Sequence, residues 1–175
     1  MDELLFIELT AEYADEIMAY RRECLDAGSS MDGCGPLRRC ETAEEFFKAI
    51  EQYKNPDTVP EGKVQATHYA CVRRSDGKLV GILQLRHRLN EYLAKYAGHI
   101  GYSVRPSERR KGYAKYMLKS ALSVCRGMGL TRVMVCCFEE NEASRRTILS
   151  AGGVYERTEL EPNEQKNIEI YWINI

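Results

Sequence analysis

The sequence has no long apolar stretch. A membrane-spanning helix needs about 20 consecutive apolar residues, and every apolar run in this chain is far shorter. The opening residues Met1–Glu3 are acidic, and the apolar run Leu4–Leu9 is too short and wrongly flanked for a secretory leader. We therefore expect a cytoplasmic protein that has no membrane partner.

The sequence also lacks the usual motifs of a metal site. Its seven cysteines form no C-x-x-C pair and its three histidines are scattered, whereas zinc sites use closely spaced pairs of ligands. The odd number of cysteines, several of them within apolar segments, indicates buried reduced thiols rather than a disulfide framework. We expect no bound metal.

The chain carries almost no net charge. Its 25 basic and 26 acidic residues give a formal charge of -1, so the basic excess of a nucleic-acid-binding protein is missing and we expect no nucleic-acid partner. The stretch from Arg105 to Lys119 nevertheless holds six basic residues and one acidic residue. Such a cluster is either a solvated basic turn or a binding site for an anion.

The basic cluster contains a pattern that suits a diphosphate. Residues Val104–Ala114 have the character of a strand end, a short loop and a helix start. The first amides of a helix have no partner within the helix and carry partial positive charge. Gly112 and Ala114 leave little side chain to keep an anion away from them. The stretch therefore predicts a diphosphate site.

An amphipathic helix is expected after this loop. Its apolar residues form one stripe, made of Ala114, Met117, Leu118, Ala121, Leu122 and Cys125. Gly127 and Gly129 predict its end, the apolar run Thr131–Phe138 predicts a buried strand, and Asn141 can cap a helix that runs to about Ala151. A strand–helix–strand crossover of this length implies parallel pairing in an α/β or α+β sheet.

The remaining segments add helices and strands around this unit. Helices are expected at 10–25, capped by Thr10, and at 42–53, where Thr42 opens a capping box. The candidate strands are Leu4–Leu9, Gln65–Arg73, Lys78–His87, Gly98–Val104, Gly153–Thr158 and Ile168–Ile173. A helical turn at Asn90–Tyr96 is expected before the fourth of them. There is no internal repeat, and the length suits one domain over residues 1–175.

At this point the motifs carry a resemblance. The pattern Val104-x-Pro106-x-x-Arg109-x-x-Gly112-x-Ala114, followed by Asn141-x-x-Ser144 and a Gly-Gly pair, resembles the GNAT (Gcn5-related N-acetyltransferase) superfamily. Arg109-x-x-Gly112-x-Ala114 is similar to its acyl-CoA signature, Q/R-x-x-G-x-G/A, and the close match covers roughly residues 97–155. The resemblance implies an α+β fold with a mixed, mostly antiparallel sheet of about seven strands flanked by about four helices. It also implies an N-acetyltransferase that moves an acetyl group from acetyl-CoA to a primary amine of a small molecule or peptide within a ternary complex.

The resemblance further implies which residues would hold acetyl-CoA. Amides within Tyr102–Val104 would contact the pantetheine arm and the thioester, and the loop Arg109–Ala114 would hold the diphosphate. Arg109, Arg110, Lys111 or Lys115 would lie near the 3′-phosphate. Asn141, besides capping its helix, would bond the pantetheine arm near the sulfur. The expected binding residues are Tyr102, Ser103, Val104, Arg109, Arg110, Lys111, Gly112, Tyr113, Ala114, Lys115, Asn141 and Ser144.

One position departs from the family pattern. Many members have a tyrosine seven residues after that asparagine, where it can protonate the departing sulfur, but this chain has Ile148. Tyr102 and Tyr155 are candidate replacements. Solvent is a third, because a thiol with a pKa near 8.5 needs little help at neutral pH.

The base that deprotonates the amine is a separate question. His99 lies on the strand expected to carry the thioester, so its imidazole could take a proton directly or through water. The alternative is that it bonds a neighbouring strand or loop. His87 and Glu91 are weaker candidates. The expected catalytic residues are therefore His99, Asn141 and Tyr102.

The acceptor pocket is expected in the segment between the first two helices, residues 26–36. Asp26, Ser29 and Asp32 are its candidate acceptor-binding residues, and the two carboxylates would favour a cationic amine. A solvated mobile loop is the alternative interpretation. The glycines of this segment would let the backbone approach a ligand closely.

Two other classes of protein stay open on the sequence. One is a non-catalytic acyl-CoA-binding or sensor domain, which Ile148 favours. The other is a nucleotide-binding or phosphopeptide-binding module that uses the same basic helix start. The oligomeric state is open as well, with a homodimer among the alternatives.

Overall fold

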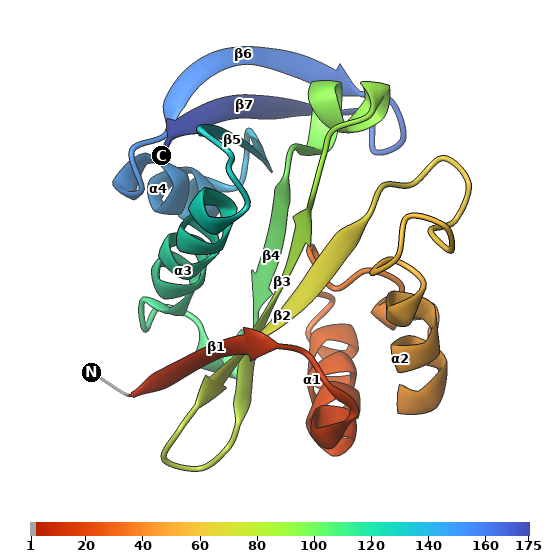
Figure 1. Cartoon of the computed structure of the whole chain (residues 1–175). Coiled ribbons are helices and arrows are strands. Elements are labelled where there is room, and N and C mark those ends of the chain that lie inside the picture. Colours follow the sequence, from red (N-terminus) through yellow and green to blue (C-terminus); the bar gives the residue numbers. More distant parts are fainter. Residues whose placement is uncertain (1–2) are drawn as a thin grey trace.

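The computed structural model describes residues 3–175 and contains one open sheet of seven strands (Figure 1). Its order is β1-β2-β3-β4-β5-β7-β6. All neighbours are antiparallel except β4 and β5, which are parallel. The strands are β1 (Leu4–Glu8), β2 (Ala66–Arg73), β3 (Leu79–Arg86), β4 (Ile100–Val104), β5 (Arg132–Phe138), β6 (Val154–Glu161) and β7 (Lys166–Asn174).

Four α-helices cover the two faces of this sheet (Figure 1). α1 (Ala14–Asp26) and α2 (Ala43–Glu51) lie on one face, while α3 (Tyr113–Gly127) and α4 (Glu142–Ser150) lie on the other. Each face has its own buried core, because alternate residues of a strand point to opposite sides. On β3, Leu83 and Leu85 pack with α3, whereas Ile82 packs with α1 and α2. This α+β architecture confirms the expected fold class.

Several local predictions are confirmed. Thr42 and Glu45 form the complete capping box of α2, and the Asn141 side chain accepts a hydrogen bond from the Ser144 amide at the start of α4. α3 ends at Gly127, and Gly129 has a φ of 82°, the left-handed conformation that favours glycine after a helix. These signals depend on neighbouring residues only, so the sequence displays them directly.

Other local predictions need correction. The Thr10 side chain caps no helix: a short 3-10 turn, Ala11–Tyr13, intervenes and α1 begins at Ala14. The reason is that the Leu9 amide still bonds the His68 carbonyl, so the chain is leaving the sheet at this point. β6 and β7 are also longer than predicted, because they pair with each other well beyond their apolar residues.

Short turns complete the described chain. They comprise 3-10 turns at Leu37–Arg39 and Pro106–Glu108 and a π-type turn at Leu93–Ala97. None of the helices within residues 3–175 combines the length and apolar character that a membrane span requires.

Candidate active site

β4 and β5 meet at one point and then diverge. Their register contains a single pair, Ile100 with Val135, whereas β4 pairs with β3 along its whole length as far as Val104. In an antiparallel ladder, successive residues direct their amides to alternate sides. Since the Arg105 amide bonds Val80 on β3, the amides of Tyr102 and Val104 face the gap toward β5. An opening in the sheet therefore lies beside Tyr102–Val104, where the amides that would contact the pantetheine arm are expected.

Ser103 differs from its two neighbours. Its amide points to β3, and its side chain lies on the opposite face of the sheet, where the hydroxyl contacts Tyr20 Oη at 2.9 Å and Cys34 Sγ at 3.2 Å. This buried chain of contacts connects β4 to α1 and to the segment between α1 and α2. Of the three expected amides, those of Tyr102 and Val104 are the ones directed into the gap.

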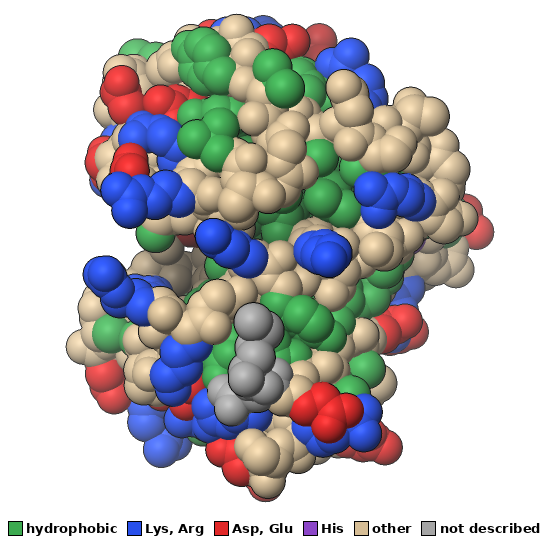
Figure 2. Space-filling view, turned by 90° about the vertical axis from the view of Figure 1, so that its left-hand side faces the viewer, with side chains coloured by type: hydrophobic (Ala, Val, Ile, Leu, Met, Phe, Trp, Pro, Cys, Tyr) green, Lys and Arg blue, Asp and Glu red, His purple; other side chains and the backbone are tan. Residues whose placement is uncertain are grey.

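The predicted diphosphate loop leads from β4 to α3. Its backbone turns sharply: Arg110 has a φ of 66° and Gly112, the N-cap residue of α3, has a φ of 85°. Within residues 3–175, no side chain caps the first turn of α3. Figure 2, seen from the side of α3 and α4, shows a notch at the left edge with lysine and arginine side chains above and below it. Because its first amides are left without a side-chain cap, the start of α3 can accept an anion.

The basic side chains of this loop have different partners. Lys111 Nζ donates to Glu108 at 2.7 Å, and Arg109 donates to the Val104 carbonyl oxygen and to Ser29 Oγ. Arg110 and Lys115 are exposed and form no ion pair with any residue that the structure describes. Among the expected 3′-phosphate ligands, Arg110 and Lys115 are therefore the two without a competing partner.

Glu108 is a residue of the diphosphate loop whose contacts the sequence reasoning missed. Its buried carboxylate bonds Arg73 at 2.7 Å, Lys78 at 2.8 Å and Lys111 at 2.7 Å. Burial alone would raise its pKa, but the hydrogen bonds from Arg73, Lys111 and Lys78 outweigh burial and lower the pKa to about 2. Glu108 thus fixes the diphosphate loop to the β2–β3 hairpin. Its signal in the sequence was that it is the one acidic residue of the basic stretch.

A polar cluster lies where α4 begins. Tyr102 Oη is 2.9 Å from Ser144 Oγ, and the Ser144 amide donates to Asn141 Oδ1 at 3.1 Å. Burial raises the pKa of Tyr102 to about 12, so its hydroxyl keeps its proton at neutral pH. The position of the usual family tyrosine is filled by Ile148, which is fully buried in the core. The structure therefore brings a phenol to this region from β4 instead of from α4.

His99 is surrounded by the sheet, and its ring nitrogen Nδ1 already has a hydrogen-bond partner. His99 is buried, and its Nδ1 accepts a hydrogen bond from the Met134 amide at 3.0 Å. A neutral ring in this arrangement carries its proton on Nε2 and has no free lone pair. Burial, chiefly, lowers the pKa of His99 to about 4. His99 thus has the strand-bonding role that was the alternative interpretation.

The weaker candidates also lie apart from the polar cluster. Burial lowers the pKa of His87, whose Nε2 is 2.9 Å from Thr67 Oγ1, and Glu91 is exposed beyond the end of β3. Tyr155 is exposed on the edge strand β6 and bonds Thr158. None of the three contacts Tyr102 or Asn141.

The predicted acceptor segment is held tightly against β4. A Cβ atom on Gly33, which has a φ of 75°, would lie 2.1 Å from the Gly101 carbonyl oxygen, so only glycine fits there. Ser29 is buried under the Arg109 guanidinium, which joins this segment to the diphosphate loop. The backbone of this segment thus approaches β4 closely at Gly33, and the close approach to a ligand stays a prediction.

Beside this segment lies an open hollow of about 450 Å³. Asp32 lines it together with Arg38, Arg39 and Glu164 of the β6–β7 turn. Asp26 is the last residue of α1, is exposed and does not line the hollow. Of the two predicted carboxylates, Asp32 is therefore the one placed beside a cavity.

Comparison with known proteins identifies the family. The sequence profile described as "Acetyltransferase (GNAT) family" matches residues 37–152, about two thirds of the chain. The chain belongs to this family of acetyltransferases. A comparison with curated protein sequences gives no match.

Solved structures of other acetyltransferases have the same fold. Ribosomal-protein-S5-alanine acetyltransferase from Vibrio fischeri aligns with a TM-score of 0.74 and 15% identity over 99% of this chain and 94% of that chain. RimL, the ribosomal L7/L12 alpha-N-protein acetyltransferase in complex with coenzyme A, aligns at 0.72 and 17% over 98% and 94%. The microcin C7 self immunity acetyltransferase MccE, in complex with acetyl-CoA and AMP, aligns at 0.73 and 18% over 100% and 94%. At these identities the likeness establishes the fold.

Proposed function

We propose that this protein transfers an acetyl group from acetyl-CoA directly to a primary amine of a small molecule or peptide. The observation that carries the proposal is the divergence of β4 and β5 beside the uncapped start of α3. The gap offers amides to an extended thioester arm, and the helix start offers amides to a diphosphate. Both parts of acetyl-CoA thus have a complementary site on one face of the sheet.

The residues that would hold acetyl-CoA follow from this geometry. The Tyr102 and Val104 amides would bond the pantetheine arm and the thioester oxygen, and the Arg110–Ala114 backbone would bond the diphosphate. Arg110 and Lys115 would bind the remaining phosphate. RimL and MccE are named as complexes with coenzyme A and acetyl-CoA, respectively, which supports this cosubstrate.

The proposed reaction is direct acyl transfer. The uncharged amine nitrogen bonds to the thioester carbon, the carbon–sulfur bond breaks, and the sulfur leaves as a thiolate. Tyr102, whose hydroxyl contacts Ser144 Oγ, supplies a proton to that sulfur and then regains one from water, while Asn141 holds Ser144 through its amide. The proton lost by the amine passes to water, because the His99 ring has no free lone pair.

The acceptor is proposed to enter from the opposite face of the sheet. The hollow beside Asp32 lies there, and the exposed carboxylate would attract a cationic amine. Two of the solved structures are named for ribosomal proteins and one for microcin self immunity. These names support an amine acceptor that is either a peptide or a small molecule. We further propose one domain over residues 1–175 in the cytoplasm, in keeping with its seven free cysteines.

A non-catalytic acyl-CoA-binding domain is the second candidate, and the core position of Ile148 favours it. Two measurements separate the candidates. Calorimetric titration with acetyl-CoA, CoA and ATP identifies the preferred ligand. A panel of polyamines, amino acids, aminoglycosides and peptides, assayed for thiol release from acetyl-CoA, identifies turnover. Tight CoA binding with no thiol release from any amine would support the second candidate, and a preference for ATP would contradict both.

A further inference from the structure

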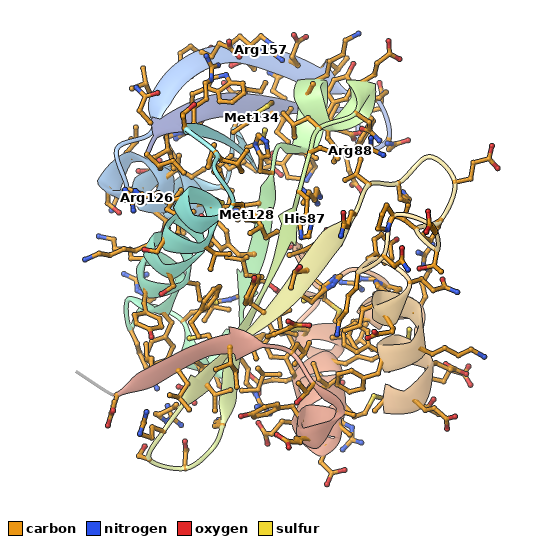
Figure 3. The ribbon with its side chains drawn as sticks, viewed as in Figure 1. His87, Arg88, Arg126, Met128, Met134 and Arg157 are labelled. Atoms are coloured by element: carbon orange, nitrogen blue, oxygen red, sulfur yellow. The ribbon has the colours of Figure 1, made fainter. Side chains whose placement is uncertain are left out.

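Arg86 is a cation that has no carboxylate partner. It is the last residue of β3 and forms no ion pair with any residue from 3 to 175. Its Nη1 donates to the Ala97 and Gly98 carbonyl oxygens, each at 3.1 Å. These bonds fix the guanidinium beside the turn Leu93–Ala97. Figure 3 labels His87 and Arg88, which follow Arg86 where β3 leaves the sheet.

The other nitrogens of this guanidinium are available. Nε and Nη2 of Arg86 have no hydrogen-bond partner in the described part of the chain. Trp172 Nε1 is the sole fully buried side-chain nitrogen or oxygen without a partner within residues 3–175, so the free N–H groups of Arg86 border solvent. An arginine edge of this kind can donate paired hydrogen bonds to a carboxylate or phosphate.

The direction of the Arg86 side chain excludes the phosphates of CoA as its partner. Side chains alternate along β3, and Arg86 shares the face of Ile82, which packs with α1 and α2. The diphosphate loop leads into α3, which packs on the opposite face with Leu83 and Leu85. An anion bound by Arg86 must therefore belong to a molecule on the acceptor side of the sheet.

Gly101 connects Arg86 to the acceptor segment. A Cβ atom on Gly101 would lie 3.1 Å from the Gly33 amide nitrogen and 3.5 Å from Arg86 Nη2. Arg86 and the residue next to Asp32 thus border the same point of β4, one residue before Tyr102. Burial lowers the pKa of Arg86, and Asp32 is the one carboxylate among the groups that raise it. Arg86 stays charged at neutral pH in any case.

We propose that Arg86 binds an anionic group, a carboxylate or a phosphate, on the same molecule whose amine is acetylated. This inference rests on the proposed function and narrows its substrate class to small amines that also carry a negative charge. Asp32 attracts the amine and Arg86 holds the anion. The two opposite charges then orient the acceptor with its nitrogen toward the gap between β4 and β5.

Matched pairs of acceptors test this inference. Thiol release is measured with β-alanine and β-alaninamide, which differ by the carboxylate, and with phosphoethanolamine and ethanolamine, which differ by the phosphate. We expect kcat/KM of the unmodified protein to be about 10- to 100-fold higher for the anionic member of one pair, as for a charge-assisted hydrogen bond. The pair that shows the preference identifies the anion as carboxylate or phosphate.

Variants assign the preference to the residue. Arg86→Gln should reduce the ratio within that pair to near 1 while its affinity for CoA, measured by calorimetry, stays unchanged and confirms folding. Arg86→Lys should keep part of the preference, because it retains the charge and loses the paired donors. Arg88→Gln is the matched control: it removes an exposed charge two residues further on and should keep the full ratio.

Two outcomes of the turnover assay would overturn the inference. One is an unmodified protein that shows no preference in either pair, and the other is a preference that persists in Arg86→Gln. Calorimetric binding of the four amines to the CoA complex separates this inference from the proposed function. Anionic amines that bind the unmodified protein but not Arg86→Gln, without thiol release, would contradict the transferase activity and support the anion site. Absence of both binding and turnover would overturn the anion site.

Discussion

Replacing Glu108 with glutamine should loosen the loop that we assign to the diphosphate. The substitution keeps the shape of the side chain but removes the charge that Arg73, Lys78 and Lys111 share. A carboxyl pKa lowered from 4.5 to about 2 corresponds to about 3 kcal/mol of interaction in the folded state. The Glu108 side chain is 5% exposed, but those of Lys78 and Lys111 are 30% and 47% exposed, so solvent screens part of this energy. We expect Glu108→Gln to lose about 2 kcal/mol of unfolding free energy at pH 7.

The pH dependence of this loss has a defined sign. A carboxyl group with a lowered pKa contributes its full stability above its unfolded value of about 4.5, and the contribution disappears as the pH falls through about 2. The difference between the unmodified protein and Glu108→Gln should therefore be constant from pH 8 to pH 5. By pH 3 the difference should have fallen to less than half of its value at pH 7. At pH 3 the carboxyl of the unfolded chain is already protonated, and that of the folded protein is approaching its pKa of about 2.

Urea unfolding at pH 7, pH 5 and pH 3 measures this difference, and calorimetry measures the affinity for CoA. We expect weaker CoA binding in Glu108→Gln, because the free Lys111 no longer holds the loop. Glu142→Gln serves as the control, since that carboxylate also bonds two arginines but is 53% exposed, and it should change stability little. A Glu108→Gln protein as stable as its parent at pH 7, or a difference that is the same at pH 3, would refute the assignment of Glu108 as the anchor of the loop.

Three further predictions concern the site itself. Gly112→Glu should lower CoA affinity more than tenfold, about 1.4 kcal/mol or more. Gly112→Ala should lower it less, because it shares the strain of the positive φ but adds no charge. Equal affinities of the two variants in calorimetry would contradict the assignment of the diphosphate to this loop. Tyr102→Phe should reduce kcat by roughly 10²-fold while CoA affinity is kept, and Ser144→Ala should reduce kcat less. A Tyr102→Phe protein with unchanged kcat in single-turnover thiol release would leave solvent as the proton donor. His99→Gln should keep the parent's dependence of rate on pH between 6 and 8, because a ring with a pKa of about 4 stays neutral in this range. If the substitution removed a rise in rate near pH 6.5 that the parent shows, His99 would be the base.

The sequence by itself determined the features that depend on neighbours in the chain. The spacing of Arg109, Gly112 and Ala114 between a strand and an amphipathic helix indicated the family, and the family profile agrees. The caps at Thr42 and Asn141 were equally visible, since a cap bonds an amide three residues away. Such features could be predicted because φ/ψ preferences, helix-start amides and apolar periodicity act over a few residues.

The tertiary structure decided which partners each polar side chain contacts. The sequence allowed His99 to be a base or a strand contact, and the structure shows a bond from the Met134 amide, 35 residues further on. Tyr102 contacts Ser144 because α4 packs beside the gap. Glu108 bonds Arg73 and Lys78, which come from the β2–β3 hairpin. Among the described residues, the course of β3 and β4 leaves Arg86 without a carboxylate partner. Charge, burial and proton position depend on residues brought together from distant parts of the chain, and a linear pattern does not contain those distances.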